Sequence, residues 1–190
     1  MTLLRRVLGL DRTDTDATIS SDTPIPAAGP GDSDSVRRIS GRLAGLPPSR
    51  ARYVAAFAYL LGRAADADFT VSDAETAQMR RLVAEAGGLD PETSELVVEL
   101  ARFQSGEFGA TEDYLVTREF KAIATPDERR ALLRCCLLVM AADDDVVADE
   151  SWLVNRIAEE LDIERPDLNA IRAEFHDRLS GVRAVRRHRE

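Results

Sequence analysis

Cysteine is nearly absent from this 190-residue chain, since it occurs only as the adjacent pair Cys135 and Cys136. Neighbouring side chains on a helix point about 100° apart, so the two thiols face different directions. With no third cysteine, the chain can form neither a disulfide framework nor a cysteine-based metal site. Because both thiols lie inside an apolar run, we expect them to be buried and unreactive.

Histidine and aromatic residues are also scarce, which leaves little material for an enzyme active site. The histidines are His176 and His188, and aromatic residues make up 5% of the chain. Catalysis by a Ser-His-Asp or Cys-His group would depend on those two histidines, and a glycosidase would lack an aromatic platform for its sugar. Gly106 and Gly109 do not have the spacing of a phosphate-binding loop. The sequence therefore favours a non-enzymatic protein.

Long apolar runs are missing as well. The longest uninterrupted one, Cys135 to Ala142, is far shorter than the roughly 18–20 residues that cross a bilayer. The first ten residues are too short and too charged for a secretory leader, so we expect a cytoplasmic protein. One apolar stripe in this segment has three possible roles: it docks on the globular part of the chain or on a partner, it docks weakly on a membrane, or it frays. Its residues are Leu3, Leu4, Val7 and Leu8.

Basic residues are fewer than acidic ones: the chain has 25 basic and 34 acidic residues, and its formal net charge is −9. Residues 49–165 carry most of the excess, with 24 acidic and 13 basic side chains. Phosphate groups would be repelled by this region, which argues against nucleic acid and favours cations or basic protein surfaces. Residues 181–190 form a small basic tail, which we interpret as a solvated chain end.

The chain divides into three parts by composition. Residues 1–48 are expected to be a flexible N-terminal segment, because residues 11–34 are rich in Asp, Thr, Ser, Pro and Gly and carry few large apolar groups. A short helix is predicted from Ser35 to Leu46, before two prolines. Residues 49–180 form the globular part, and residues 181–190 form the tail.

What is present from residue 49 onward is helical patterning. Apolar residues recur at three- and four-residue spacing, and no segment alternates with a period of two. Thr125 followed by Pro126 and Glu128 is a strong helix start, and Asp90 before Pro91 is another. We predict an all-α, compact multi-helix bundle. The almost wholly apolar segment 132–142 is expected to be its central buried helix, and Trp152 is expected to pack in the core.

One internal duplication stands out. Two segments match without gaps at an offset of 75 residues, and each has Asp, then Val three residues on, then Glu seven residues on. The Asp ends one helix, the Val folds back under the turn, and the Glu lies where the positive end of the next helix dipole favours a carboxylate. Each unit is thus a helix, an acidic turn and a second helix. The matching residues are Asp68, Val71 and Glu75 in the first copy, and Asp143, Val146 and Glu150 in the second.

With these motifs the chain resembles the TerB family, which comprises tellurite-resistance proteins and the N-terminal domain of the DjlA co-chaperones. The resemblance covers residues from about 49 to about 179. The turn glycine common in that family is replaced by Phe69 and Asp144, and no J-domain signature follows. The resemblance implies a role in stress response or tellurite resistance that is exercised through binding to a protein partner. It is carried by Ala65-Asp66-Ala67-Asp68, Val71-Ser72 and Glu75, and by Ala141-Ala142-Asp143, Val146 and Glu150.

Two readings of the acidic turns remain open. In the first, the carboxylates bind a divalent cation, Ca²⁺ or Mg²⁺, because hard oxygen ligands suit these ions. Neither copy has the glycine and terminal glutamate of an EF-hand, so such a site would be assembled from both segments. In the second reading the same residues only cap helices, and the domain is a protein-interaction scaffold. The candidate ligands are Asp68, Glu75, Asp143 and Glu150, with Asp66, Asp145 and Asp149 nearby.

Overall fold

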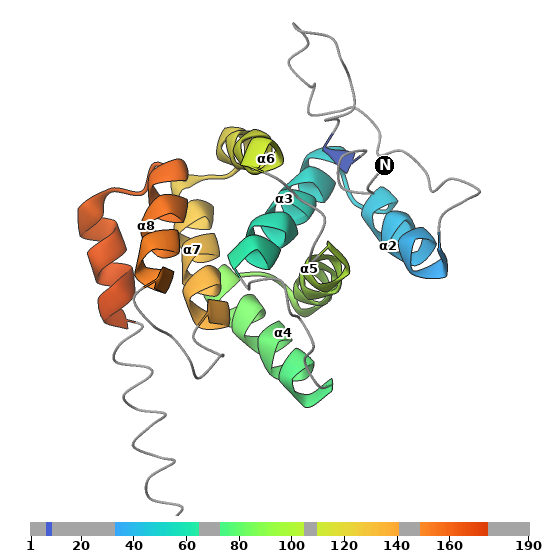
Figure 1. Ribbon diagram of the computed structural model, residues 1–190. Helices are drawn as coiled ribbons and strands as arrows, with labels where there is room; N and C mark the ends of the chain where they lie inside the picture. The colour runs from blue at the N-terminus through green and yellow to red at the C-terminus, as the bar shows by residue number, and fades with distance from the viewer. Residues whose placement is uncertain (1–6, 9–32, 65–72, 105–109, 141–148, 175–190) are drawn as a thin grey trace, which may run out of the picture.

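The computed structural model describes residues 7–8, 33–64, 73–104, 110–140 and 149–174, and all regular structure in these ranges is helical (Figure 1). This confirms the predicted all-α class. The expectations for the flexible segment and for the basic tail fall mostly on residues outside these ranges. The helices are α2 (Asp34–Ala44), α3 (Pro48–Ala64), α4 (Asp73–Gly87), α5 (Pro91–Gln104), α6 (Ala110–Ile123), α7 (Pro126–Met140) and α8 (Asp149–Glu160), followed by a helical stretch at 165–174.

The centre of the bundle is α3, and the prediction that the 132–142 segment would be the central helix is wrong. Every residue from Ala51 to Leu61 is buried, and α3 packs against α2, α5, α6 and α7. The cause is its content of alanine and glycine, because small side chains let neighbouring helices approach from every side. At Gly62 an added Cβ would lie 3.2 Å from the carbonyl oxygen of Ala101 on α5. The helix α7 is largely buried too, but it lies beside α3.

The predicted helix starts are confirmed where the structure describes them. At the start of α7 the Thr125 backbone N–H donates to Glu128 Oε2 at 2.8 Å, and the Glu128 N–H donates to Thr125 Oγ1 at 3.3 Å. This reciprocal pair is a capping box. At the start of α5 the Thr93 N–H donates to Asp90 Oδ1 at 2.9 Å. Both helices therefore begin where their side chains can satisfy backbone donors that lack a partner in the helix.

The duplicated units are joined through α7. Their first helices, α3 and α7, run in the same general direction in Figure 1, and Cys136 Sγ on α7 lies 3.9 Å from Leu60 O on α3. The second helices, α4 and α8, both pack against α7. The units therefore interlock, with α4 of the first unit lying on the first helix of the second.

The start of the chain contributes to this core. Val7 and Leu8 are 2% and 0% exposed and belong to the main apolar cluster. Of the readings left open for the first apolar stripe, the structure thus supports docking on the body for these two residues, while Leu3 and Leu4 lie outside the described ranges. The helix α2, which confirms the short helix predicted before the two prolines, also packs on the body, against α3 and α5.

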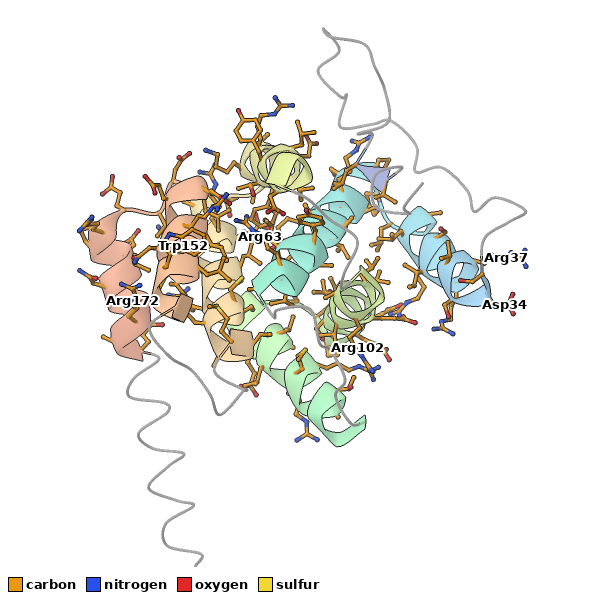
Figure 2. All side chains as sticks on the ribbon, in the orientation of Figure 1. Asp34, Arg37, Arg63, Arg102, Trp152 and Arg172 are labelled. Carbon is orange, nitrogen blue, oxygen red and sulfur yellow. The ribbon has the colours of Figure 1, made fainter. Side chains whose placement is uncertain are left out.

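Trp152 corrects a second expectation. Its side chain is 60% exposed, whereas Val154 and Ile157 on the same helix are buried. Residues two apart on a helix point in nearly opposite directions, so Trp152 lies off the buried face that Val154 defines. The Arg156 guanidinium, one turn away, covers its ring at 5.3 Å from the centroid (Figure 2).

Within the described ranges, no helix is both long and apolar enough to cross a membrane.

Candidate functional site

The predicted acidic site lies at the two turns, and the structure describes the helices that flank them. Glu75 is the third residue of α4, and Asp149 and Glu150 are the first two of α8. The backbone of these three residues is thus in a first helical turn, where the helix dipole favours negative charge. Their side chains lie outside the described part of the structure, as do Asp66, Asp68, Asp143 and Asp145 entirely.

The helices α3 and α7, which lead into the two acidic turns, both end at the same end of the bundle. The contact between Leu60 and Cys136 lies four residues before the last residue of each helix, Ala64 in α3 and Met140 in α7. Because α3 and α7 run in the same direction, both helices end on the same side of that contact. Both acidic turns therefore begin at the same end of the α3 and α7 pair. They lead to different places, because α4 and α8 start on different sides of α7 in Figure 1, so the structure does not bring Glu75 and Glu150 together.

A half-buried ionic network around Arg63, near the end of α3, was not identified from the sequence. The Arg63 side chain is 12% exposed and pairs with Asp113 on α6, Nε to Oδ2 at 3.3 Å, and with Glu160 on α8, where Nη2 donates to Oε1 at 3.1 Å. Tyr59 donates to Asp113 at 2.7 Å, and Thr117 Oγ1 lies 3.4 Å from Glu160. The network ties three helices together. The signal for it is Arg63, an arginine that directly follows the largely apolar run 53–62.

The charges in this network hold one another ionised. Burial alone would raise the pKa of Glu160, but the hydrogen bonds and charges of Arg63 and Arg156 outweigh it and keep this pKa below its usual range. Burial works against the charged form of Arg63, yet its pKa is raised because Glu160 and Asp113 favour the charged form more strongly. The described side chains include no group of three or more His, Cys, Asp or Glu that could hold a metal ion.

The family model for tellurite resistance protein TerB matches residues 54–173, which is more than half of the chain. The chain belongs to the TerB family. The match begins inside α3 and runs to the last described helical stretch, so it contains both acidic turns and leaves α2 outside. No curated protein and no solved structure matches the chain. TerB is not a known enzyme family.

The two thiols of this TerB chain are buried, as predicted. Cys135 and Cys136 are both 0% exposed, and their sulfur atoms lie 3.9 Å from the backbone carbonyl oxygens of Val83 and Leu60. Burial raises the pKa of the Cys135 thiol to about 12 and raises that of Cys136 as well. Thiolates are the reactive form, so neither side chain is available for redox or oxyanion chemistry at neutral pH.

We expect neither thiol to react with a thiol-reactive disulfide reagent at pH 7.5 in the native protein. The thiolate fraction at a pKa near 12 is on the order of a thousandfold below that of a free cysteine, and burial blocks the reagent further. In guanidinium chloride two equivalents should react at once. Native labelling of even one thiol within minutes would show that α7 separates from α4, which covers Cys135, or from α3, which covers Cys136, and would contradict the structure.

Proposed function

We propose that this TerB-family chain is a non-catalytic binding domain that acts in tellurite or related stress resistance, and that its two acidic turns together bind one divalent cation, Ca²⁺ or Mg²⁺. The proposal rests on the parallel course of α3 and α7, which starts both turns at the same end of the bundle.

Electrostatics favours a cation at such a place. Carboxylates that crowd together cannot all stay ionised without a compensating charge. A helix N-terminus supplies only partial positive charge, which is weaker than a full divalent ion. Oxygen ligands from Asp and Glu match the preference of Ca²⁺ and Mg²⁺. We assign Asp68 and Asp143 to the ion first, because they lie in the turns that leave the shared end of α3 and α7; Glu75 and Glu150, at the starts of α4 and α8, are the further ligands that the motif offers.

The alternative is a protein-interaction scaffold whose acidic turns only cap helices. One observation in this chain favours it: Glu128, in the first turn of α7, accepts from the Thr125 backbone N–H at 2.8 Å and needs no ion. Glu75 and Glu150 occupy comparable positions at the starts of α4 and α8. The two readings differ in whether the carboxylates respond to a metal ion.

Thermal melting with and without cation separates the two readings. For the wild-type protein, a cation at about a hundred times its Kd should add about 2.7 kcal/mol to the free energy of unfolding. In the variant with Asp68→Asn, Glu75→Gln, Asp143→Asn and Glu150→Gln this gain should vanish while the helical circular dichroism persists. If the residues only cap helices, the variant instead loses about 0.5–2 kcal/mol per cap with or without ion.

A matched control removes the same number of carboxylates away from the turns. Its gain in stability on adding cation should equal that of the wild type, because the turn carboxylates are intact and only the non-specific screening of surface charge by the ions is altered. Identical melting of the wild type in Ca²⁺, Mg²⁺ and chelator would end the cation proposal and leave the scaffold. The control substitutions are Asp34→Asn, Glu92→Gln, Glu159→Gln and Glu164→Gln.

A further inference from the structure

The helix α2 is a basic amphipathic helix that lies outside the TerB match at 54–173. Val36, Ile39 and Leu43, at positions i, i+3 and i+7, form its buried stripe against α3 and α5. Arg38 and Arg42 follow one another at a spacing of four residues, so they lie on one side of that stripe. In Figure 1 the helix sits at the side of the bundle, beyond α5 and the first half of α3.

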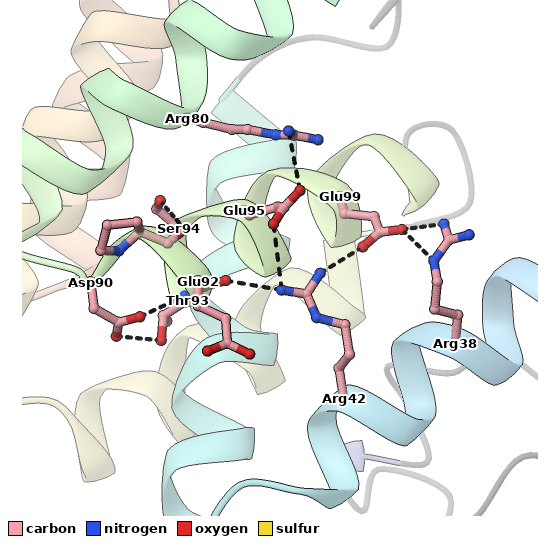
Figure 3. A network of polar contacts seen from close by, with 10 residues as sticks. Arg38, Arg42, Arg80, Asp90, Glu92, Thr93, Ser94, Glu95 and Glu99 are labelled. Atoms are coloured by element: carbon pink, nitrogen blue, oxygen red, sulfur yellow. Dashed lines mark hydrogen bonds and ion pairs between the residues drawn. The ribbon is translucent and has the colours of Figure 1, made fainter.

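The surface opposite these arginines is acidic. Glu95 and Glu99, one turn apart on α5, face α2 (Figure 3). Glu99 accepts from both Arg38 and Arg42, the latter by Nη1 to Oε2 at 3.1 Å. Arg42 Nη2 also donates to the Glu92 carbonyl at 3.1 Å and lies 3.9 Å from Glu95 Oε2. The face of α3 and α5 under α2 thus combines an apolar floor with an acidic rim.

The fit of α2 to this face is incomplete. Arg38 is 62% exposed in its pair with Glu99, and Glu95 is 44% exposed in its pair with Arg42, so these two ion pairs contribute little to stability. The Arg42–Glu99 pair, at 26% and 21%, is the more buried one. A cleft of about 710 Å³ runs along α2, where Ile39 and Val98 lie between charged side chains of α2, α4 and α5. Ser40 is buried at 2% exposure, and its hydroxyl has no hydrogen-bond partner in the described structure. A buried hydroxyl of this kind weakens the docking of α2.

We propose that the face of α3 and α5 which α2 covers is a docking site for a basic amphipathic helix of a partner protein, and that α2 occupies this site in cis. We call this face the α2 groove. Its ligand has apolar residues at i, i+3 and i+7 and two arginines or lysines at a spacing of four on one flank. This chemistry is complementary to Glu95 and Glu99, and α2 itself is an example of it. The proposal is independent of the cation at the acidic turns.

The partner must compete with a helix that is tethered next to the site. A short tether gives α2 an effective concentration on the order of millimolar, which lowers the apparent affinity of any ligand in trans. Weakening the cis contact should therefore increase trans binding, because a larger fraction of molecules has the groove open. This increase is what the experiment measures.

The probe is a fluorescein-labelled synthetic peptide with the sequence of residues 33–46, and the readout is fluorescence anisotropy. The full-length variant with Arg38→Glu and Arg42→Glu should bind the peptide at least tenfold more tightly than the wild-type chain does. Adding Glu95→Arg and Glu99→Arg to that variant should close the groove again and return the affinity to the wild-type level. A peptide that carries glutamate at both arginine positions should bind neither the wild type nor the first variant.

The matched control is Arg37→Glu, which reverses a charge on the same helix at a side chain that is 52% exposed and paired with Asp34 on α2 itself. It should behave like the wild type. Equal peptide affinity for the wild type and the Arg38→Glu, Arg42→Glu variant, or no binding to that variant when folded, would overturn the proposal. Unfolding of the variant would do the same, because α2 would then be an integral part of the domain. A dimer formed by exchanged α2 helices would show that a second copy is the occupant, not a partner protein.

Discussion

Replacement of Phe57 by alanine should lower the free energy of unfolding by about 3–5 kcal/mol, the largest loss that we expect from a single substitution. Phe57 is fully buried in the central helix α3, and its ring lies 5.8 Å from that of Tyr53 and 6.2 Å from that of Phe120 on α6. The end of α4 also lies against it, since a Cβ on Gly87 would be 3.4 Å from Phe57 Cζ. Helices on several sides hold the cavity open, so little of the loss can be recovered by collapse.

Urea denaturation followed by circular dichroism measures this loss. Tyr114→Ala is the control, because Tyr114 is 65% exposed on α6 and should change stability by less than about 0.5 kcal/mol. The two variants remove aromatic rings of similar size from neighbouring helices. Equal effects of the two substitutions would contradict the position of α3 at the centre of the core.

Replacement of Arg63 by methionine should cost about 2–3 kcal/mol at pH 7. Methionine keeps most of the volume of the side chain but leaves Asp113 and Glu160, which are 22% and 25% exposed, without their shared cation. Removal of one partner from a fully buried pair costs roughly 3–5 kcal/mol, and access of water lowers the figure here. Arg134→Met is the control, because its partner Glu174 is 55% exposed and the loss should stay under about 1 kcal/mol.

The same substitution should change the acid dependence of stability. The pKa of Glu160 is lowered in the folded protein, so its contribution is complete above the unfolded value of about 4.3 and is lost as the pH falls through the folded value. The wild type should therefore lose stability more steeply than Arg63→Met between about pH 5 and pH 3. Parallel curves of unfolding free energy against pH for the two proteins would show that Arg63 does not stabilise the ionised Glu160.

Local features of the fold were predictable because they depend on neighbours in the sequence. The cap formed by Thr125 and Glu128 spans three residues, and Asp90 caps the helix that begins right after it. The two duplicated units of helix, acidic turn and helix were predictable for a related reason, since the duplication repeats one local sequence pattern. Such signals need no knowledge of what each helix packs against.

The features that sequence reasoning missed depend on packing at a distance. The large apolar residues of α3 recur at the spacing of one buried helix face, so the burial of its alanine-rich remaining faces is visible only once its neighbours are in place. Arg63 and Glu160 are 97 residues apart, and Arg42 and Glu99 are 57 apart. No local sequence pattern indicates that these side chains form ion pairs. Trp152 was placed in the core by its size, whereas its position on α8 relative to Val154 decides its exposure.

For the candidate site, the motif residues and their order could be predicted, and so could the helices that flank them. The shared end of α3 and α7 could not, because it depends on whether the two helices run parallel or antiparallel. The sequence is compatible with both directions. The course of the two helices in Figure 1, together with the contact of Cys136 with Leu60, establishes the parallel direction.

The most direct test of the account is the stoichiometry of cation binding, measured by isothermal titration calorimetry with Ca²⁺ and Mg²⁺. The account predicts one ion per chain. It also predicts that Asp68→Asn with Glu75→Gln, or Asp143→Asn with Glu150→Gln, abolishes the binding heat completely, because either turn alone supplies only half of the ligands. Two ions per chain, with one retained in each half-site variant, would contradict the shared site. So would the absence of any binding heat at millimolar cation.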